Sequence, residues 1–147
     1  MPTHAENRFV PYTAEQMFRL VAEVDKYPEF LPWCVGARIK RRQGNTLIAD
    51  LMIGFRMVRE SFTSRVTLSP SHRIDTTFSD GPFQYLKSYW IFHPVEGGCN
   101  VDFFVEFEFK SKMLQNLISV LFNEATRRMV AAFDQRARHL YGPSEPI

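Results

Sequence analysis

Apolar residues between Met113 and Tyr141 recur every three to four positions, which is the spacing of one face of an α-helix. The apolar positions are Met113, Leu114, Leu117, Ile118, Leu121, Ala125, Met129, Phe133, Ala137 and Leu140. Ser111 precedes the segment as a candidate N-cap, and Gly142-Pro143 follows it as a stop. Such a helix is roughly 43 Å long, at about 1.5 Å per residue. Its long apolar stripe needs a large apolar surface, so the pattern predicts a C-terminal helix packed on a sheet.

Between residues 35 and 109 the hydrophobic period changes to two, which is typical of strands with one buried face. Successive strands are expected at 35–40, 47–53, 58–68, 74–78, 85–92 and 101–109. Turn-forming sequences separate them, such as Gln43-Gly44-Asn45 and Glu96-Gly97-Gly98. Consecutive strands joined by such short connections favour an antiparallel meander.

The N-terminal part adds one more strand and short helical structure. Residues 3–10 are expected to form a strand, and Thr13 is a candidate N-cap for an amphipathic helix at 14–24. Two prolines in the run Tyr27-Pro28-Glu29-Phe30-Leu31-Pro32-Trp33-Cys34 allow at most a short helical turn there. The predicted fold class is therefore α+β, with a curved antiparallel sheet of about seven strands around the long C-terminal helix and short helices after the first strand. Residues 1–147 are expected to form one domain, with 143–147 as a flexible tail.

The composition is unusual in one respect, because the chain has 14 phenylalanines and only 7 glycines. So many aromatic rings in a small domain indicate either a bulky core or a cavity with aromatic walls. The net charge of +2 indicates that the chain as a whole is not a polycation that seeks nucleic acid, and no DNA partner is expected. Cys34 and Cys99 form no CxxC pair, so buried free thiols in a reducing compartment are expected. No signal peptide or long apolar run is visible, so the chain is expected to be cytoplasmic, at most peripheral on the inner face of the cell membrane.

The order of elements and several sequence motifs resemble the coenzyme Q-binding branch of the START-like superfamily, also called polyketide cyclase/lipid transport. The motifs are Tyr27–Cys34, Arg59-Glu60-Ser61-Phe62-Thr63-Ser64, Gly81-Pro82-Phe83, Phe107-Glu108-Phe109-Lys110-Ser111, and Arg128–Phe133 followed by Arg136. The resemblance covers nearly the whole chain and implies a helix-grip fold. It also implies binding of a lipid quinone, such as ubiquinone or a precursor. The bacterial side of the family includes a ribosome-association toxin, so a ribosome-associated role is the alternative.

Signals for catalysis are weak. The chain has no GxSxG, HExxH or glycine-rich phosphate loop. The four histidines are scattered, so neither a metal site nor a catalytic set of residues is expected. Asp102, Glu106 and Glu108 share one side of their strand, which a solvated outer face explains. We therefore expect a non-enzymatic protein that requires no cofactor; a cyclase or dehydratase is a second alternative.

Glu60 shares parity with Phe62 and Val66, which places a carboxylate on the apolar face of its strand. A buried carboxylate needs a partner or a proton. One interpretation is a glutamate at the rim of the sheet or paired with Arg56. The other is a polar anchor for a quinone ring, with the hydroxyls of Ser64 and Ser88 as further donors.

Ten side chains are candidates for the wall of a cavity between the sheet and the long helix. They are Trp33, Leu51, Phe62, Phe78, Leu86, Trp90, Phe92, Phe122, Met129 and Phe133. A slot lined in this way would suit a flat quinone and its isoprenoid tail, because burial of the tail contributes roughly 25 cal/mol per Å². The alternative for each aromatic residue is ordinary core packing.

Two basic clusters remain. They consist of Arg38, Lys40, Arg41 and Arg42 near the second strand and of Arg127, Arg128, Arg136 and Arg138 on the long helix. These charges are either a solvated face or a surface for anionic lipid headgroups or ribosomal RNA phosphates. The segment from Tyr27 to Trp33 could be a lid that touches a membrane and covers the cavity mouth.

Overall fold

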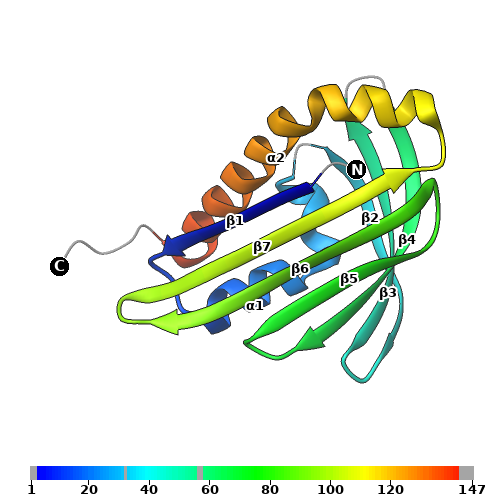
Figure 1. The fold of residues 1–147 in the computed structure, drawn as a ribbon. Helices are drawn as coiled ribbons and strands as arrows, with labels where there is room; N and C mark the ends of the chain where they lie inside the picture. Colours follow the sequence, from blue (N-terminus) through cyan, green and yellow to red (C-terminus); the bar gives the residue numbers. More distant parts are fainter. Residues whose placement is uncertain (1–2, 32, 56–57, 143–147) are drawn as a thin grey trace.

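The computed structural model describes residues 3–31, 33–55 and 58–142 (Figure 1). The elements are β1 (Thr3–Val10), α1 (Ala14–Ala22), the 3-10 helix η1 (Val24–Glu29), β2 (Cys34–Gln43), β3 (Thr46–Phe55), β4 (Val58–Ser69), β5 (Arg73–Asp80), β6 (Phe83–Val95), β7 (Gly98–Phe109) and α2 (Lys112–Tyr141). This order and the α+β class are as predicted. The predicted tail at 143–147 lies outside the described residues.

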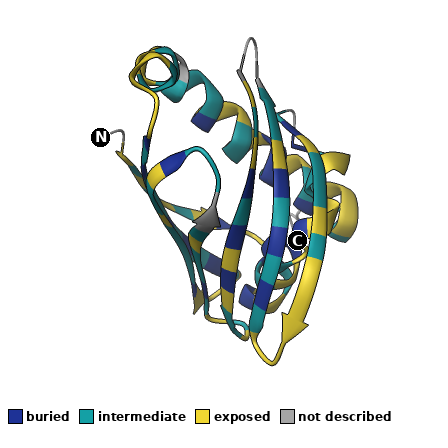
Figure 2. Ribbon diagram, turned by 90° about the vertical axis from the view of Figure 1, so that its right-hand side faces the viewer, coloured by how far each residue is buried: buried dark blue, intermediate teal, exposed yellow. Residues whose placement is uncertain are grey.

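All seven strands belong to one antiparallel sheet in the order β1-β7-β6-β5-β4-β3-β2. Strands β2 to β7 form the predicted meander, and β1 returns to pair with β7. The curved sheet has the helices on its concave side, with α2 lying along it (Figure 1). Along the strands, buried and exposed residues alternate in bands (Figure 2). Most side chains that the period of two marked as apolar are buried or half-buried, but Val35 is 46% exposed because a β-bulge between Cys34 and Gly36 shifts the register.

Helix α1 begins as predicted and ends two residues early. Thr13 Oγ1 accepts a hydrogen bond from the Gln16 amide at 3.0 Å, and the Thr13 amide donates to Gln16 Oε1 at 2.9 Å, which is a complete capping box. Glu23 then leaves the helical region at φ −81° and ψ 69°. Residues 24–29 continue as the 3-10 helix η1, which contains Pro28.

Helix α2 has the predicted caps. Ser111 Oγ accepts from the Leu114 amide at 3.2 Å, and Gly142 ends the helix at φ 85°. The predicted apolar stripe is wrong at both ends, because Met113 and Leu140 are 80% and 42% exposed. Met113 lies about 140° around the helix from Ile118, at 100° per residue, and so faces away from the sheet. Leu140 is in the last turn, where the helix ends.

The interior is packed at one end and hollow at the other. Under α1, side chains from α1 and the sheet are fully buried, among them Leu20, Val21, Leu47 and Phe92. Phe133 and Ala137 in the C-terminal half of α2 join this core. The N-terminal half of α2 covers the hollow end. Within the described residues no helix is long and apolar enough to cross a membrane.

The acidic residues of β7 lie on the convex side, as predicted. Asp102 accepts hydrogen bonds from Asn7 Nδ2 and, at 3.0 Å, from His93 Nε2. The Asn7 bond and then the His93 bond lower the pKa of this carboxyl. Glu106 accepts from Thr3 Oγ1 at 3.2 Å. Asp102 and Glu106 therefore link β7 to its neighbouring strands β1 and β6 on the outer face.

Candidate ligand-binding cavity

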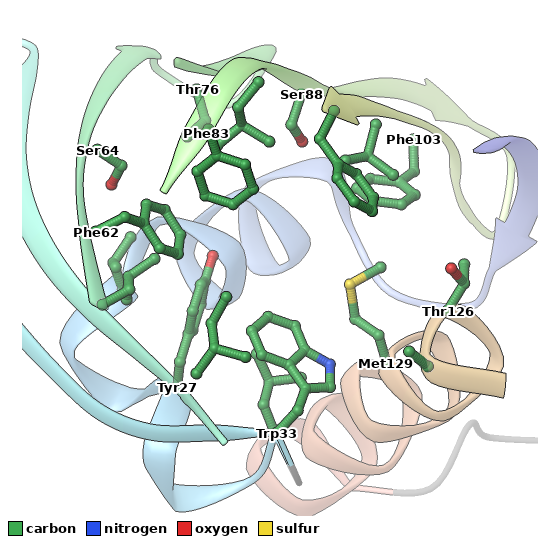
Figure 3. Close-up of a pocket in the computed structure, with 18 of the residues that line it drawn as sticks. Tyr27, Trp33, Phe62, Ser64, Thr76, Phe83, Ser88, Phe103, Thr126 and Met129 are labelled. Atoms are coloured by element: carbon green, nitrogen blue, oxygen red, sulfur yellow. The ribbon is translucent and has the colours of Figure 1, made fainter. Parts of the chain in front are cut away.

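A cavity of about 240 Å³, partly open to the surface, lies between the concave face of the sheet, the η1–β2 segment and α2. Its wall consists mainly of aromatic and aliphatic side chains (Figure 3). The strand residues that line the cavity come from the strand faces that the period of two assigned to the interior. Most of the predicted wall residues line it, namely Trp33, Leu51, Phe62, Leu86, Trp90, Phe122, Met129 and Phe133.

Phe92 and Phe78 were also predicted in the wall, and the structure places them outside it. Phe92 is 0% exposed and packs edge-on against Phe18 of α1 at 6.1 Å between ring centroids. It shares the parity of Trp90 but lies at the end of β6 that α1 covers. Phe78 packs against Phe83 at 6.2 Å. Both rings support the wall from behind.

The phenylalanines of β7 and the start of β6 form a large part of the wall that was not predicted. Phe103, Phe107 and Phe109 line the cavity together with Phe83. Phe83 stacks on Phe109 at 4.8 Å and meets Phe62 edge-on at 5.0 Å. The alternation of β7 had marked its three residues as inward, so that signal could have identified them.

Five polar side chains of the described residues approach the cavity from the sheet and α2: Glu60, Ser64, Thr76, Ser88 and Thr126. Ser64 Oγ donates to the Ala49 carbonyl at 3.4 Å, and Thr126 Oγ1 donates to the Phe122 carbonyl at 2.9 Å. These two hydroxyls are therefore partly committed to the backbone. In the part of the chain that the structure describes, Ser88 and Thr76 form no side-chain hydrogen bond, and Figure 3 shows Ser88 pointing into the cavity.

Glu60 lines the cavity, as its parity predicted, and lies opposite Ile53 in the sheet. Its suggested partner Arg56 lies outside the described residues. Among the residues that are described, none forms an ion pair with Glu60. Among the described wall residues, Glu60 is therefore a carboxylate without an ion pair, in a wall that is mainly apolar.

Tyr27 closes the cavity on the side of η1. Its hydroxyl donates to the Val21 carbonyl at 2.6 Å, and its ring meets Phe133 edge-on at 5.7 Å. Burial, reinforced by the nearby Cys34, raises the pKa of this phenol far above its ordinary value. Tyr27 is thus a fixed part of the wall and a poor proton donor or acceptor.

The predicted lid covers the cavity, but its aromatic side chains do not project outward. Trp33 and Tyr27 line the cavity, and the Phe30 ring packs against Phe133 at 5.2 Å. Arg136 lies 5.1 Å over the Phe30 ring and pairs with Glu29 at 3.0 Å. Tyr27 and Phe30, which the sequence suggested to be exposed, are half-buried because both rings pack against Phe133 of α2. Contact of this segment with a membrane stays a prediction.

The two basic clusters do not form one surface. Arg38 and Arg41 lie on the convex side of the sheet, away from α2, while Arg42 lies near Glu15 and Glu23 beside α1. Lys40 lines the same hollow as Arg38. On α2, Arg127 and Arg138 are exposed. Arg128 pairs with Glu124 at 2.9 Å, and Arg136 is only 15% exposed.

Cys34 and Cys99 are free and buried, as predicted. Burial raises the pKa of each thiol to about 11. In the described part of the chain, no group of three or more His, Cys, Asp or Glu side chains could hold a metal ion.

Residues 10–134 match the family described as polyketide cyclase / dehydrase and lipid transport. The chain belongs to this family. The predicted START-like resemblance is thus confirmed. Solved structures of the same fold include a START superfamily protein from Mycobacterium smegmatis, with a TM-score of 0.81 over 94% of this chain and 98% of that one at 17% identity. At that identity the likeness shows the fold alone.

Closer family relatives carry two kinds of name. The ribosome association toxin RatA of Vibrio cholerae is 38% identical over 94% of this chain and 96% of its own. The coenzyme Q-binding protein COQ10 homolog B of Xenopus laevis is 35% identical over 97% of this chain, which spans 60% of that protein. The 18 kDa protein CC1736 of Caulobacter crescentus has a solution structure with a TM-score of 0.79 and 36% identity, covering 97% of this chain and 100% of that one.

Proposed function

We propose that this protein binds a lipid quinone, ubiquinone or a precursor, in its cavity and does not transform it. The observation that carries the proposal is the hollow end of the interior, with aromatic walls and few polar groups. The protein would act in the cytoplasm, with peripheral contact to the membrane that holds such lipids. Carrying the quinone would support respiratory electron transport or quinone biosynthesis.

The size of the cavity fits the ring of a quinone. An apolar cavity of roughly 150 Å³ binds benzene in an engineered protein, so about 240 Å³ accommodates a substituted ring. A long isoprenoid tail exceeds this space and would leave through the open side. Each part of the tail that stays against the wall contributes roughly 25 cal/mol per Å².

The polar groups divide into donors and an acceptor. Ser88 and Thr76 can donate hydrogen bonds to a quinone carbonyl. An ionised Glu60 only accepts hydrogen bonds, so it suits a ring hydroxyl of the reduced quinol or of a hydroxylated precursor. The printed name of the Xenopus relative, a coenzyme Q-binding protein, supports the same class of ligand.

The described wall residues favour binding over catalysis. Glu60 and Tyr27 are the described wall residues that could transfer a proton. The Tyr27 hydroxyl, however, already donates its proton to a backbone carbonyl. A cyclase or dehydratase would depend on Glu60 alone. If such an activity is present, Glu60→Gln should abolish it, whereas for a carrier the change should only alter ligand affinity.

Extraction of the purified protein with organic solvent, followed by mass spectrometry, tests the proposal. We expect a quinone in the extract of the unchanged protein and of Ala131→Phe, whose side chain lies on the exposed side of α2. Ala125→Phe puts a ring into the cavity and should remove the quinone from the extract. Extracts without quinone, or equal amounts from both variants, would contradict the proposal.

A second candidate function is association with ribosomes. The relation to RatA of Vibrio cholerae, over almost its full length, favours it. Sedimentation with ribosomal subunits at low and high salt tests it. Co-sedimentation that weakens with salt supports this function, and its absence at low salt contradicts it.

A further inference from the structure

The convex face of β2, β3 and β4 carries arginines in register with one another. Arg41 lies opposite Ile48, and Ile48 lies opposite Arg65, so two arginines flank one aliphatic side chain in the same row. Strands are about 4.8 Å apart, which places the two Cα atoms roughly 10 Å from each other. Both side chains line one hollow, together with Gln43 and Thr46.

Three more cations lie on this face. Arg38 and Lys40 line a second hollow with Ser61, Thr63 and the Asp50 carboxylate, which accepts a hydrogen bond from Thr63 Oγ1 at 2.7 Å. Arg59 lies opposite Gly54, and its guanidinium lies over that glycine. We define Arg38, Lys40, Arg41, Arg59 and Arg65 as the convex basic face.

The convex basic face has little countercharge. Asp50 pairs with Arg38 at 3.2 Å. In the described part of the chain, the remaining four cations have no carboxylate within ion-pair distance. The neighbours of Arg65 in register are Ile48 and Thr77.

Some arginines elsewhere in the described chain are paired, for example Arg73 with Asp75 at 2.9 Å and Arg136 with Glu29 at 3.0 Å. Positive charges that gather on one surface repel one another. The four cations of this face that have no ion pair in the described chain would therefore be neutralised favourably by a polyanion.

We propose that the convex basic face binds the phosphate backbone of RNA. Arginine, serine and threonine side chains are the usual donors to phosphate oxygens. A membrane surface would instead favour exposed aromatic residues at the interface. Among the described residues, the exposed large aromatic side chain, Phe9, lies on β1 and not on this face; the exposed apolar side chains of the convex face, Val35 and Met52, are not aromatic. The contacts are to the backbone, so binding should not depend on RNA sequence.

The RNA proposal rests on the second candidate function only in taking the ribosome as the cellular partner, and it does not depend on the cavity. Under that function, RNA is the part of the ribosome that this chain would contact. It also differs from the clusters expected from sequence, because β4 contributes Arg59 and Arg65 while Arg42 and the arginines of α2 lie elsewhere.

Fluorescence anisotropy with a labelled single-stranded oligouridine of about 20 nucleotides tests this face. The slope of log K against log salt should change by about 0.7 for each phosphate contact. The double variant Arg41→Glu/Arg65→Glu should thus weaken binding at least about tenfold at low salt and reduce the slope by about 1.4. Arg41→Gln/Arg65→Gln should reduce it in the same direction, and circular dichroism should show both variants folded because both side chains are exposed.

The matched control is Arg127→Glu/Arg138→Glu, which makes the same change in net charge on exposed positions of α2. We expect this variant to bind oligouridine as the unchanged protein does. Equal weakening by both double variants, or no weakening by either, would overturn the proposal. Binding to phosphatidylglycerol vesicles but not to oligouridine would also overturn it. A protein that binds oligouridine through this face but does not sediment with ribosomes would support the face and contradict the second candidate function.

Discussion

At the scale of residues, the two tryptophans of the wall differ in how firmly they are held. Trp90 contacts Phe103 at 4.5 Å and Phe133 at 5.0 Å, and it stacks on Phe92 at 6.3 Å. It therefore belongs to the cavity and to the packed core together. Trp33 follows η1 and lies half-buried at the cavity, at the start of β2.

This difference predicts two separable effects. Trp33→Ala should weaken quinone binding by about 1 kcal/mol, roughly fivefold, with little loss of stability. Trp90→Ala should weaken binding and also destabilise the fold by about 3 kcal/mol, because it empties a site between three rings. Quinone titration and chemical denaturation measure the two effects. Unchanged binding in both variants would show that the two tryptophans do not contribute to quinone binding.

Gly81 is required for the contact between the rings of Phe83 and Phe62. It has φ +143°, and a Cβ there would lie 2.5 Å from the Phe62 Cβ. Gly81→Ala should therefore cost about 2–4 kcal/mol of unfolding free energy. Gly44 also has positive φ, +60°, but a Cβ on this residue would have no neighbouring atom within 4 Å, so Gly44→Ala should cost only about 1 kcal/mol. Similar melting temperatures for the two variants would contradict this ranking.

Parity along a strand was enough to place many residues of the candidate site. Glu60, Ser64 and Ser88 line the cavity because the period of two fixes which side of the sheet they occupy. Parity carries no information about position along the sheet, however. Phe92 has the correct parity and lies at the filled end, under α1, so sequence alone could not exclude it from the wall.

At the scale of elements, helix α2 is attached firmly at its C-terminal half. Tyr12 donates to the Gly142 carbonyl and Tyr141 donates to the Gln16 carbonyl, both at 2.9 Å. Arg136 joins α2 to η1 through Glu29 and Phe30. These contacts hold η1, and with it Tyr27, against the cavity.

Replacement of Arg136 should therefore loosen η1. We expect Arg136→Ala to lower the unfolding free energy by about 1–2 kcal/mol, from the lost ion pair and the lost cation–π contact. Arg138→Ala, an exposed position two residues later, should change it by less than about 0.5 kcal/mol. Thermal unfolding of the two variants measures the difference, and equal melting temperatures would show that the Arg136 contacts contribute nothing.

The order and type of the elements could be predicted because caps and periodicity are local signals. Thr13, Ser111 and Gly142 have the predicted roles at helix ends. The 3-10 helix η1 was harder to predict, because its residues have no helical period and the side chains that contact Tyr27 and Glu29, Phe133 and Arg136, lie in α2, more than a hundred residues later. The aromatic residues of this segment therefore looked exposed in the sequence but are covered in the fold.

At the scale of the whole molecule, the two sides of the sheet have different chemistry. The concave side is apolar and encloses the cavity, and the convex side carries the cations of β2 and β4, of which Arg38 is paired with Asp50. We expect a substitution of an exposed residue on the convex side to leave the cavity unchanged. The ligand of the cavity and the polyanion of the convex face can therefore be tested independently. Relatives of this chain are named either for ribosome association or for coenzyme Q binding.

The central claim is that the cavity takes a quinone, and tryptophan fluorescence tests it most directly. The chain contains 2 tryptophans, and both Trp33 and Trp90 line the cavity, so quenching of their emission reports on this site. Titration with a ubiquinone that has a short decyl tail should give saturable quenching at one ligand per chain. Ala125→Phe should abolish this quenching and Ala131→Phe should preserve it. Linear quenching without saturation, equal in all three proteins, would contradict the account.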